Sequence, residues 1–434
     1  MPLTVQRCER CGNEQAELAS TVECPICGGL LELLHGTVGD APALKALFDA
    51  RLQETLRPDG PDAPATRSGV WRYHELVMPS ATEREIVTHP EGNTPLLSRA
   101  AIARWTGVEA LHLKHEGRNP TGSFKDRGMT TAVTQARRLG ARAVACASTG
   151  NTSASLASYA AQAGIPALVI VPAGGVALGK LSQTLAYGAR TLLVDGDFDA
   201  CLALVREAGE ALGVYVVNSV NPFRIEGQKT IGLELLHQLQ WAAPDWIVLP
   251  AGNLGNTAAL GKALMEAKRL GLIASVPRIA AVQAEGAAPF AAAFANDFRT
   301  RTPVRAETVA SAIRIGDPAS WDRGVRAIRE TNGVALAVRD DEILEAKAVV
   351  DGAGVGCEPG SAAAVAGVRA LVRAGTIRPS DRVVAILTGH VLKDPGVLLD
   401  YHRAPAAGET SRPGANAPVQ IAASLSEVER VLRR

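Results

Sequence analysis

The sequence contains no run of eighteen or more apolar residues, so we expect no membrane-spanning helix. Its first twelve residues, MPLTVQRCERCG, lack the basic and then apolar regions of a secretory signal. An excess of charge of either sign is also missing, because 45 Lys and Arg residues balance 44 Asp and Glu residues. These absences give no reason to expect a membrane or a nucleic acid as a partner.

The composition is that of a globular protein with a large core. At 434 residues, 47% of them hydrophobic and 21% charged, the chain is long enough for two or three domains. Its seven cysteines are odd in number, and four of them form two Cys-x-x-Cys pairs. This usage favours a reducing, cytoplasmic setting with a metal site over a disulfide framework.

The two Cys-x-x-Cys pairs, CERC and CPIC, have the spacing of a zinc ribbon. Two thiolates three residues apart can face one metal ion, and two such turns complete a tetrahedron. Gly12 and Gly28 follow the two turns and relieve the backbone there. A site made of four cysteines leaves no open coordination position, so we predict a structural zinc ion. The predicted ligands are Cys8, Cys11, Cys24 and Cys27.

From about residue 95 to 400, short apolar runs alternate with long Ala- and Leu-rich helical windows. For example, ARAVACAS precedes TSASLASYAAQAG, and DWIVLPAG precedes NTAALGKALMEAKRLG. This alternation predicts βαβ units and buried parallel sheet. Ligands of such folds lie in the crevice at the carboxyl ends of the strands, where the polar motifs of this chain fall.

Composition also divides the chain into parts. We expect a ribbon at 1–35, an extended and helical arm at 36–90, a main region at 91–403 and a C-terminal part at 404–434. Within the main region, a smaller domain is expected at about 126–222. The C-terminal part begins with a linker and continues with a strand-like run, VQIAA at 419–423. A helix follows, with Ser424 and Glu427 as its capping box.

Lys125 is one of only nine lysines and lies in NPTGSFKDRGM, a Gly/Ser turn before an expected helix start. It can clamp a phosphate, carry a cofactor covalently or be a solvated surface charge. The phosphate-clamp motif requires glycine before the lysine and Ser or Thr after it, whereas here Phe124 and Asp126 flank it. STGNTSAS and PAGNLGNT each follow a strand and open a helix, which leaves free N–H groups for an anion. Two anion sites beside this lysine suggest a phosphorylated cofactor and a substrate with a carboxylate.

Six segments together closely resemble the threonine synthases: NPTGSFKDRGM, STGNTSAS, NSVNPFRIEGQKT, PAGNLGN, EPGSAA and LTGHVLKDP. Those enzymes belong to the fold-type II pyridoxal-phosphate (PLP) family, as do tryptophan synthase β and the threonine dehydratases. The resemblance covers about residues 90 to 400. It implies an α/β, tryptophan synthase β-like fold with two parallel-sheet domains, to which the small zinc ribbon is added. It also implies PLP as cofactor, O-phospho-L-homoserine as substrate and a homodimer.

The resemblance assigns roles to individual residues. Lys125 would bind the cofactor covalently and then shuttle protons; its neutral amine requires partial burial, for which Phe124 would supply an apolar wall. Asn151 would hold the ring hydroxyl of the cofactor, and Thr388 its pyridine nitrogen. The cofactor phosphate would lie on Gly252, Asn253, Leu254, Gly255 and Asn256. The substrate would contact Ser148, Thr149, Thr152, Asn218, Ser219 and Arg224.

The implied reaction replaces the phosphate of O-phospho-L-homoserine with water and yields L-threonine. Arg224 suits a phosphate dianion, although an arginine there can also cap a helix or pair with an acid. A cysteate synthase-like enzyme acting on phosphoserine and sulfite, or another fold-type II lyase, is the nearest alternative. A threonine dehydratase fits less well, because that family has a glycine-only phosphate loop and a serine-centred asparagine loop.

Two alternatives are not enzymes. A binding protein that merely kept the fold is disfavoured, because every position expected to do chemistry is filled, including Lys125. Nucleic-acid binding by the ribbon is disfavoured because glutamates outnumber its two arginines. The glutamates are Glu9, Glu14, Glu17, Glu23 and Glu32.

Overall fold

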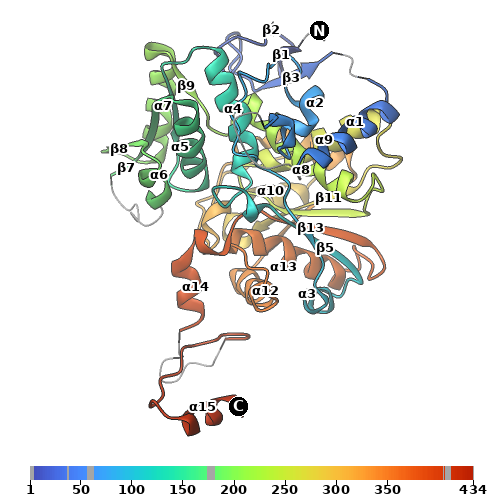
Figure 1. The fold of residues 1–434 in the computed structure, drawn as a ribbon, viewed down its shortest axis with the longest axis vertical. Helices are drawn as coiled ribbons and strands as arrows, with labels where there is room; N and C mark the ends of the chain where they lie inside the picture. Colours follow the sequence, from blue (N-terminus) through green and yellow to red (C-terminus); the bar gives the residue numbers. More distant parts are fainter. Residues whose placement is uncertain are drawn as a thin grey trace.

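The computed structural model describes residues 4–36, 39–55, 63–173, 181–403, 405 and 412–433. The strands of these residues form three separate sheets. Figure 1 shows the smallest sheet beside the N-terminus, a second sheet with its helices to the left, and the largest sheet below. The C-terminal segment leaves the body and ends apart from it (Figure 1).

The smallest sheet is antiparallel, has three strands in the order β2-β1-β3, and is formed by the predicted ribbon. Alternate residues of its third strand are buried, as expected for a sheet with one covered face. The strands are β1 (Thr4–Cys8), β2 (Glu14–Ala16) and β3 (Leu31–His35).

The other two sheets are built from βαβ units, as the sequence predicts. The four-stranded sheet is parallel, in the order β8-β7-β6-β9. Its strands are β6 (Ala143–Ala147), β7 (Ala167–Pro172), β8 (Arg190–Val194) and β9 (Val214–Val216).

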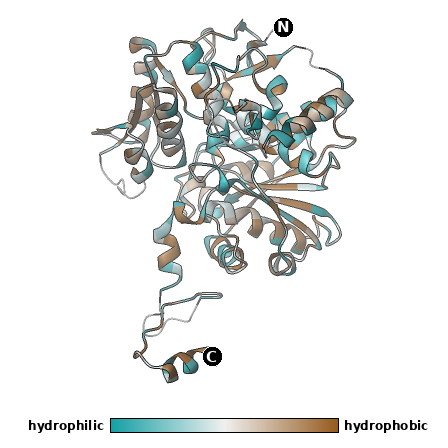
Figure 2. Cartoon of the chain, in the orientation of Figure 1, coloured by the Kyte–Doolittle hydropathy of each residue, from teal (hydrophilic) through white to brown (hydrophobic). Residues whose placement is uncertain are grey.

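The six-stranded sheet has the order β12-β11-β10-β13-β5-β4, and only the pairing of β4 with β5 is antiparallel. The last strand along the chain, β13, therefore lies in the middle of the sheet, between β10 and β5. The three central strands, β11, β10 and β13, are buried along nearly their whole length, and Figure 2 shows strands of this sheet mostly in brown, the colour of hydrophobic residues. The strands of the sheet are β4 (Leu96–Leu97), β5 (Ala110–His115), β10 (Trp246–Pro250), β11 (Arg278–Ala284), β12 (Val334–Val338) and β13 (Arg382–Leu387).

The helices begin and end where local chemistry allows. The longest, α8, starts with Pro222 at its first position, and the Asn221 side chain accepts a hydrogen bond from the Phe223 N–H. None of the helices in the described ranges combines the length and the apolar character needed to cross a membrane. The first eight helices are α1 (Ala41–Glu54), α2 (His74–Val77), α3 (Ala100–Thr106), α4 (Lys125–Arg138), α5 (Asn151–Ala163), α6 (Ser182–Ala186), α7 (Phe198–Leu212) and α8 (Pro222–Gln238). The others are α9 (Gly255–Arg269), α10 (Pro289–Phe294), α11 (Trp321–Glu330), α12 (Asp340–Gly352), α13 (Pro359–Arg373), α14 (Pro395–Tyr401) and α15 (Leu425–Leu432).

The segment expected to be an arm at 36–90 is helical in part, and it packs against the main body. Phe48, Trp71 and Tyr73 are fully buried in the same apolar core as residues of β10 and β11. The Trp71 indole donates a hydrogen bond to the Thr130 hydroxyl of α4 at 2.8 Å. This segment therefore contributes to the support of α4.

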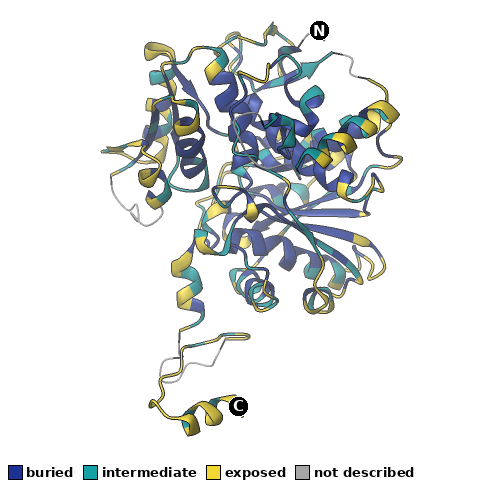
Figure 3. Ribbon diagram, in the orientation of Figure 1, coloured by how far each residue is buried: buried dark blue, intermediate teal, exposed yellow. Residues whose placement is uncertain are grey.

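The C-terminal part differs from expectation in one element. The strand expected at 419–423 is absent: these residues pair with no other strand in the described chain, and Val419 and Ile421 are exposed. The expected helix does form, and Ser424 Oγ accepts a hydrogen bond from the Glu427 N–H. Figure 3 shows this segment as mostly exposed. Residues 404 and 406–411 of the expected linker lie outside the described residues.

Two glycines allow α4 and α8 to approach each other closely. A Cβ atom on Gly227 would lie 1.8 Å from the Arg127 carbonyl oxygen, and one on Gly128 would lie 2.8 Å from the Arg224 carbonyl oxygen. Any larger residue at either position would push the helices apart. The contact brings the first turn of α4, with Lys125, beside the first turn of α8, with Arg224.

Beside this contact lies a cluster of four fully buried charges. Arg127 Nε donates to Glu116 Oε2 at 2.7 Å, and Arg127 Nη2 donates to Glu234 Oε1 at 2.9 Å. Lys114 Nζ donates to Glu234 Oε1 at 2.5 Å and to the Thr94 carbonyl oxygen at 2.8 Å. The cluster joins β5, α4 and α8, because each of these elements supplies at least one of its charges.

Replacing Gly227 with alanine should lower the free energy of unfolding by about 3 kcal/mol, because the new Cβ atom would collide with the backbone of α4. Chemical denaturation measures the change. Gly396→Ala is the control, since a Cβ atom there meets nothing within 4 Å, and it should change stability by less than about 1 kcal/mol. Equal stability of the two variants would contradict the close approach.

Candidate active site

The predicted site residues lie at the carboxyl ends of parallel strands. Ser148 follows β6, Asn218 follows β9, Gly252 follows β10 and Thr388 follows β13. Lys125 begins α4, in the connection that leaves β5. The Phe124 N–H donates a hydrogen bond to the Thr388 carbonyl oxygen at 3.0 Å, which ties the lysine loop to the end of β13.

The Lys125 amine lies over an apolar surface. Its Nζ atom is 4.2 Å from the centre of the Phe124 ring, the contact that the sequence predicts. Burial and, to a smaller extent, the positive charge of Arg224 lower the pKa of Lys125 to about 7, against the opposing effect of Glu358. A substantial fraction of this amine is therefore neutral near pH 7, and only a neutral amine is a nucleophile or a base.

Glu358 joins the two residues predicted to hold the cofactor ring. Asn151 Nδ2 donates to Glu358 Oε2 at 3.0 Å, and the Thr388 hydroxyl donates to Glu358 Oε1 at 3.3 Å. Thr388 Oγ1 also lies 2.9 Å from Ser361 Oγ. Burial raises the pKa of Glu358, although Asn151 stabilises its charged form. Asn151 comes from the four-stranded side and Thr388 from the six-stranded side, so this carboxyl group lies where the two sides meet.

Glu358 and Lys393 are site residues for which sequence reasoning found no role. Both lie in segments quoted above, EPGSAA and LTGHVLKDP. Lys393 donates a hydrogen bond to Gln183 of α6, and Gln183 Nε2 donates to the Thr121 carbonyl oxygen at 3.2 Å. The sequence did offer one signal for Glu358. It is a carboxylate directly before Pro359, the first residue of α13.

The loop between β10 and α9 has the geometry of an anion site. Leu254 has a left-handed backbone with φ of 63°, which turns the chain so that the first N–H groups of α9 are free. Asn253 anchors the loop: its Oδ1 accepts from the Ala319 N–H at 3.2 Å and its carbonyl oxygen from the Ser320 N–H at 3.1 Å. Both amide atoms of Asn256 are buried without a partner among the described residues. The N–H groups of α9 and Nδ2 of Asn256 are donors that fit a phosphate group.

Arg224 is the second candidate for binding an anion. It is fully buried, and its Nη1 donates to the Val217 carbonyl oxygen at 3.1 Å. Its Nε and Nη2 atoms have no partner among the described residues, and the ion pair considered as an alternative does not form there. Burial lowers the pKa of Arg224 to about 10, so it is still a cation at neutral pH. A buried cation with two free donors fits a phosphate or a carboxylate.

The remaining predicted substrate contacts differ in their surroundings. The Asn218 amide is occupied by backbone: Oδ1 accepts from the Ala147 N–H at 3.2 Å and Nδ2 donates to the Ala147 carbonyl oxygen at 3.1 Å. In this arrangement Asn218 joins β6 to the end of β9. Ser148 Oγ accepts from the Gly150 N–H at 3.3 Å. Three further residues are half-buried near the same strand ends: Thr149, Thr152 and Ser219.

The four N-terminal cysteines come together as predicted. Their Sγ atoms lie within 4.8 Å of one another, with 3.5 Å between Cys8 and Cys27 and 3.7 Å between Cys11 and Cys24. Four thiolates about 2.3 Å from a tetrahedral zinc ion would be about 3.8 Å apart. Gly12 and Gly28 have φ of 74° and 67°, as a tight turn behind each pair requires. The donor set and its spacing therefore fit zinc.

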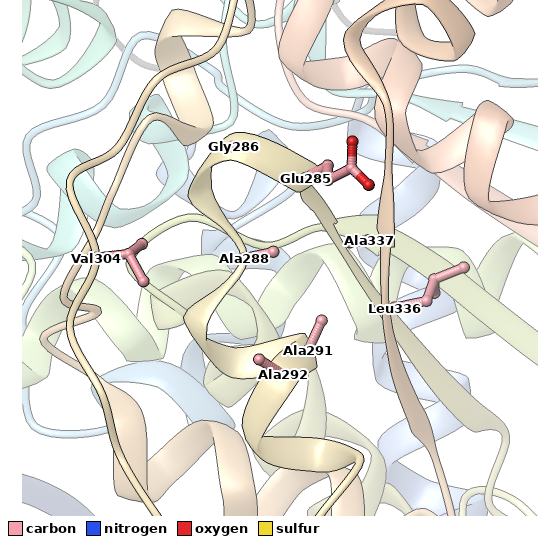
Figure 4. Close-up of a pocket in the computed structure, with 8 residues that line it drawn as sticks. All are labelled: Glu285, Gly286, Ala288, Ala291, Ala292, Val304, Leu336 and Ala337. Carbon is pink, nitrogen blue, oxygen red and sulfur yellow. The ribbon is translucent and has the colours of Figure 1, made fainter.

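A separate hollow of about 460 Å³ lies beside α10 and β12. Figure 4 shows Glu285 as its single charged lining residue, among small and apolar side chains. None of the predicted site residues lines it. It lacks the cations and free donors that a phosphate requires, so it is not the candidate site.

Comparisons with known proteins identify relatives of this chain. The profile of the family described as "Pyridoxal-phosphate dependent enzyme" matches residues 87–389. A threonine synthase of Methanosarcina acetivorans is 46% identical over 401 residues, which is 92% of this chain and 94% of that one. A threonine synthase of Methanocaldococcus jannaschii is 41% identical over 433 residues, which is 99% of each chain.

Solved structures show the same fold. A threonine deaminase from Solanum lycopersicum aligns with a TM-score of 0.63 at 21% identity and covers 84% of this chain and 94% of that one. Maize serine racemase aligns with a TM-score of 0.63 at 22% identity and covers 76% of this chain and 95% of its own.

The lowered pKa predicts the reactivity of Lys125. In cofactor-free protein, the rate at which an amine-acylating reagent modifies Lys125 should rise with pH and reach half its maximum near pH 7. Arg224→Met should move this midpoint to higher pH, because a nearby positive charge is removed. Arg137→Met, at an exposed position of the same helix, should leave it unchanged. Peptide mass mapping follows the modification; an unmoved midpoint in Arg224→Met would rule out the proposed electrostatics.

Proposed function

The chain belongs to the family of pyridoxal-phosphate-dependent enzymes, and we propose that its reaction within this family is that of a threonine synthase. In this reaction O-phospho-L-homoserine and water yield L-threonine and phosphate. The observation that carries the proposal is the buried Arg224, whose Nε and Nη2 atoms have no partner among the described residues and whose charge acts on the amine of Lys125. Threonine synthases that are 41% and 46% identical over nearly the whole chain support the same substrate.

Pyridoxal phosphate fits the residues at the strand ends. Its phosphate matches the first N–H groups of α9 and the Asn256 amide, which has no partner in the described ranges. Its ring hydroxyl and nitrogen match Asn151 and Thr388, which face a shared carboxyl group. When bound, the cofactor withdraws electrons from the substrate carbons and so acidifies their C–H bonds.

The residues around the substrate then have distinct roles. We assign the covalent attachment of the cofactor, and proton transfer at Nζ, to Lys125, because its amine is partly neutral near pH 7. Phe124 excludes water from one side of that amine. Arg224 binds and neutralises the phosphate that leaves the substrate, since it stays charged when buried. The substrate carboxylate binds at the start of α5, near Ser148, Thr149 and Thr152.

Several other features belong to the same proposal. The smaller domain is assigned to residues at about 126–222, a division supported by the four-stranded sheet, whose strands run from Ala143 to Val216. The chain is assigned to the cytoplasm as a homodimer with a small-molecule substrate and with no nucleic-acid or membrane partner. Its balanced charge supports the absence of a nucleic acid. A structural zinc ion on Cys8, Cys11, Cys24 and Cys27 is supported by the geometry of the ribbon.

The zinc assignment predicts a metal content. Freshly purified protein should hold one zinc ion per chain, and Cys24→Ser should lose most of it, because three thiolates bind zinc more weakly than four. Atomic absorption measures the ratio. Cys201→Ser, at a buried cysteine of α7, is the matched control and should keep the metal. A parent protein with far less than one zinc ion per chain would contradict the assignment.

The activity is tested with purified, cofactor-saturated protein. O-phospho-L-homoserine should be converted to equal amounts of phosphate and threonine, and phosphoserine with sulfite should give no cysteate. Lys125→Ala should fold, lack the yellow colour of covalently bound cofactor and make no threonine. Formation of cysteate without threonine would favour the cysteate synthase-like alternative. If neither threonine nor cysteate forms, the proposed reaction is refuted.

A further inference from the structure

Several acidic side chains of the ribbon bind to the rest of the protein. Glu17 Oε1 accepts from Arg138 of α4 at 2.7 Å, and Glu23 Oε1 accepts from Arg206 of α7 at 3.0 Å. Glu32 lies 3.6 Å from Arg326 of α11. The ribbon therefore contacts helices on both sides of the candidate site.

A further contact of the ribbon, between Glu9 and Arg323, is also largely buried. Glu9, next to the cysteine ligand Cys8, accepts from Arg323 Nε at 2.7 Å. The Arg323 side chain is 2% exposed and the Glu9 side chain 12% exposed. Arg323 also donates to the Leu31 carbonyl oxygen of β3, so the ribbon holds this guanidinium through two groups. A buried arginine needs such partners to stay in place.

Arg323 lies in the first turn of α11, and the start of α11 holds the candidate phosphate loop. The N–H groups of Ala319 and Ser320 donate to the Oδ1 atom and the carbonyl oxygen of Asn253. Gly324 packs so closely on Leu254 that a Cβ atom there would lie 2.9 Å from Leu254 Cδ1. A leucine in a left-handed conformation persists only where its surroundings enforce it.

A second set of contacts places the ribbon over the helices beside α11. His35 Nε2 lies 3.0 Å from Glu226 Oε2 on α8, and Lys262 Nζ of α9 donates to the Leu33 carbonyl oxygen at 2.6 Å. The ribbon thus contacts the three helices whose first turns carry Arg224, Asn256 and Arg323.

We infer that Glu9 is a positioning residue for the loop that binds the cofactor phosphate. Through Arg323 it fixes the start of α11, and α11 in turn holds Asn253 and Leu254 in the conformation that frees the N–H groups of α9. The ribbon therefore preorganises the anion site in addition to folding around its own metal. This inference rests on the proposed role of the 252–256 loop.

The test compares two alanine variants of the ribbon, Glu9→Ala and Glu23→Ala. Each removes one carboxylate from the same small unit, but Glu23 pairs with the half-exposed Arg206 of α7, a helix that packs on the strands of the four-stranded sheet. Titration of cofactor-free protein with pyridoxal phosphate, followed by visible absorbance, measures the dissociation constant. Glu9→Ala should raise it about tenfold, the loss expected for one charge-assisted hydrogen bond. Glu23→Ala should change it less than about twofold.

Three further measurements separate positioning from general instability. Both variants should keep the zinc content of the parent, and at saturating cofactor Glu9→Ala should have a kcat close to the parent value. Glu9→Gln keeps an oxygen acceptor, so it should lose less cofactor affinity than Glu9→Ala. If the alanine variant does not fold, Glu9→Gln replaces it in the comparison with Glu23→Ala. In a double-mutant cycle, the effects of Glu9→Ala and Asn253→Ala on cofactor affinity should not add.

Unchanged cofactor affinity in Glu9→Ala and Glu9→Gln, equal losses in the Glu9 and Glu23 variants, or additive effects in the cycle would each overturn the inference. Threonine formation by the parent tests the proposed function separately. An unchanged affinity in the Glu9 variants of an active threonine synthase would refute the positioning role alone.

Discussion

Arg127 and the two carboxylates that it joins hold together the elements on which the candidate site is built. Glu116, Glu234 and Arg127 are out of contact with water, and Lys114 completes the cluster. Burial alone would raise the pKa of Glu234, but the charges of Arg127 and Lys114 lower it below its ordinary value. Removing one member of such a cluster leaves an uncompensated buried charge, which costs about 3–5 kcal/mol. Because Arg127 lies two residues after Lys125, the same cluster fixes the start of α4.

Buried polar groups in this cluster have partners, whereas several of those at the candidate site do not. This difference distinguishes structural polar groups from groups that can bind a ligand. In the cluster, each charged side chain has at least one charged partner, and the hydroxyl of Thr94 and the carbonyl oxygen of Gly69 take part as well. At the candidate site, Arg224, Asn256 and Ser123 keep buried polar atoms without a partner in the described part of the chain. Buried polar atoms are rarely left unpaired in a structure that has no use for them. Such atoms also occur elsewhere, as in Gln6 and Thr191, so it is the position of this group at the strand ends, near Lys125, that points to a ligand site.

Much of this arrangement follows from the sequence, because apolar runs and strand-to-helix turns are local features. The parallel strands around Ala143–Ala147 and Trp246–Pro250, the helix starts at Asn151 and Gly255 and the four-cysteine cluster were all predicted. The role of Glu358 was not, since its partner Asn151 lies 207 residues away and no local pattern links them. The docking of the ribbon was missed for the same reason. The strand expected at 419–423 does not form, because a strand-like run of residues needs the edge of another strand to pair with.

The position of β13 has a consequence for how the chain is made. This strand is the last to be synthesised, yet it lies between β10 and β5, so the six-stranded sheet stays in two pieces until residues 382–387 are available. Until then β10 and β5 each present an open edge, and such edges pair readily with other chains. Closure depends on contacts between residues far apart in sequence, which form slowly. The nascent protein is thus most exposed to misassembly just before its synthesis ends, when helper proteins that cover sheet edges would matter most.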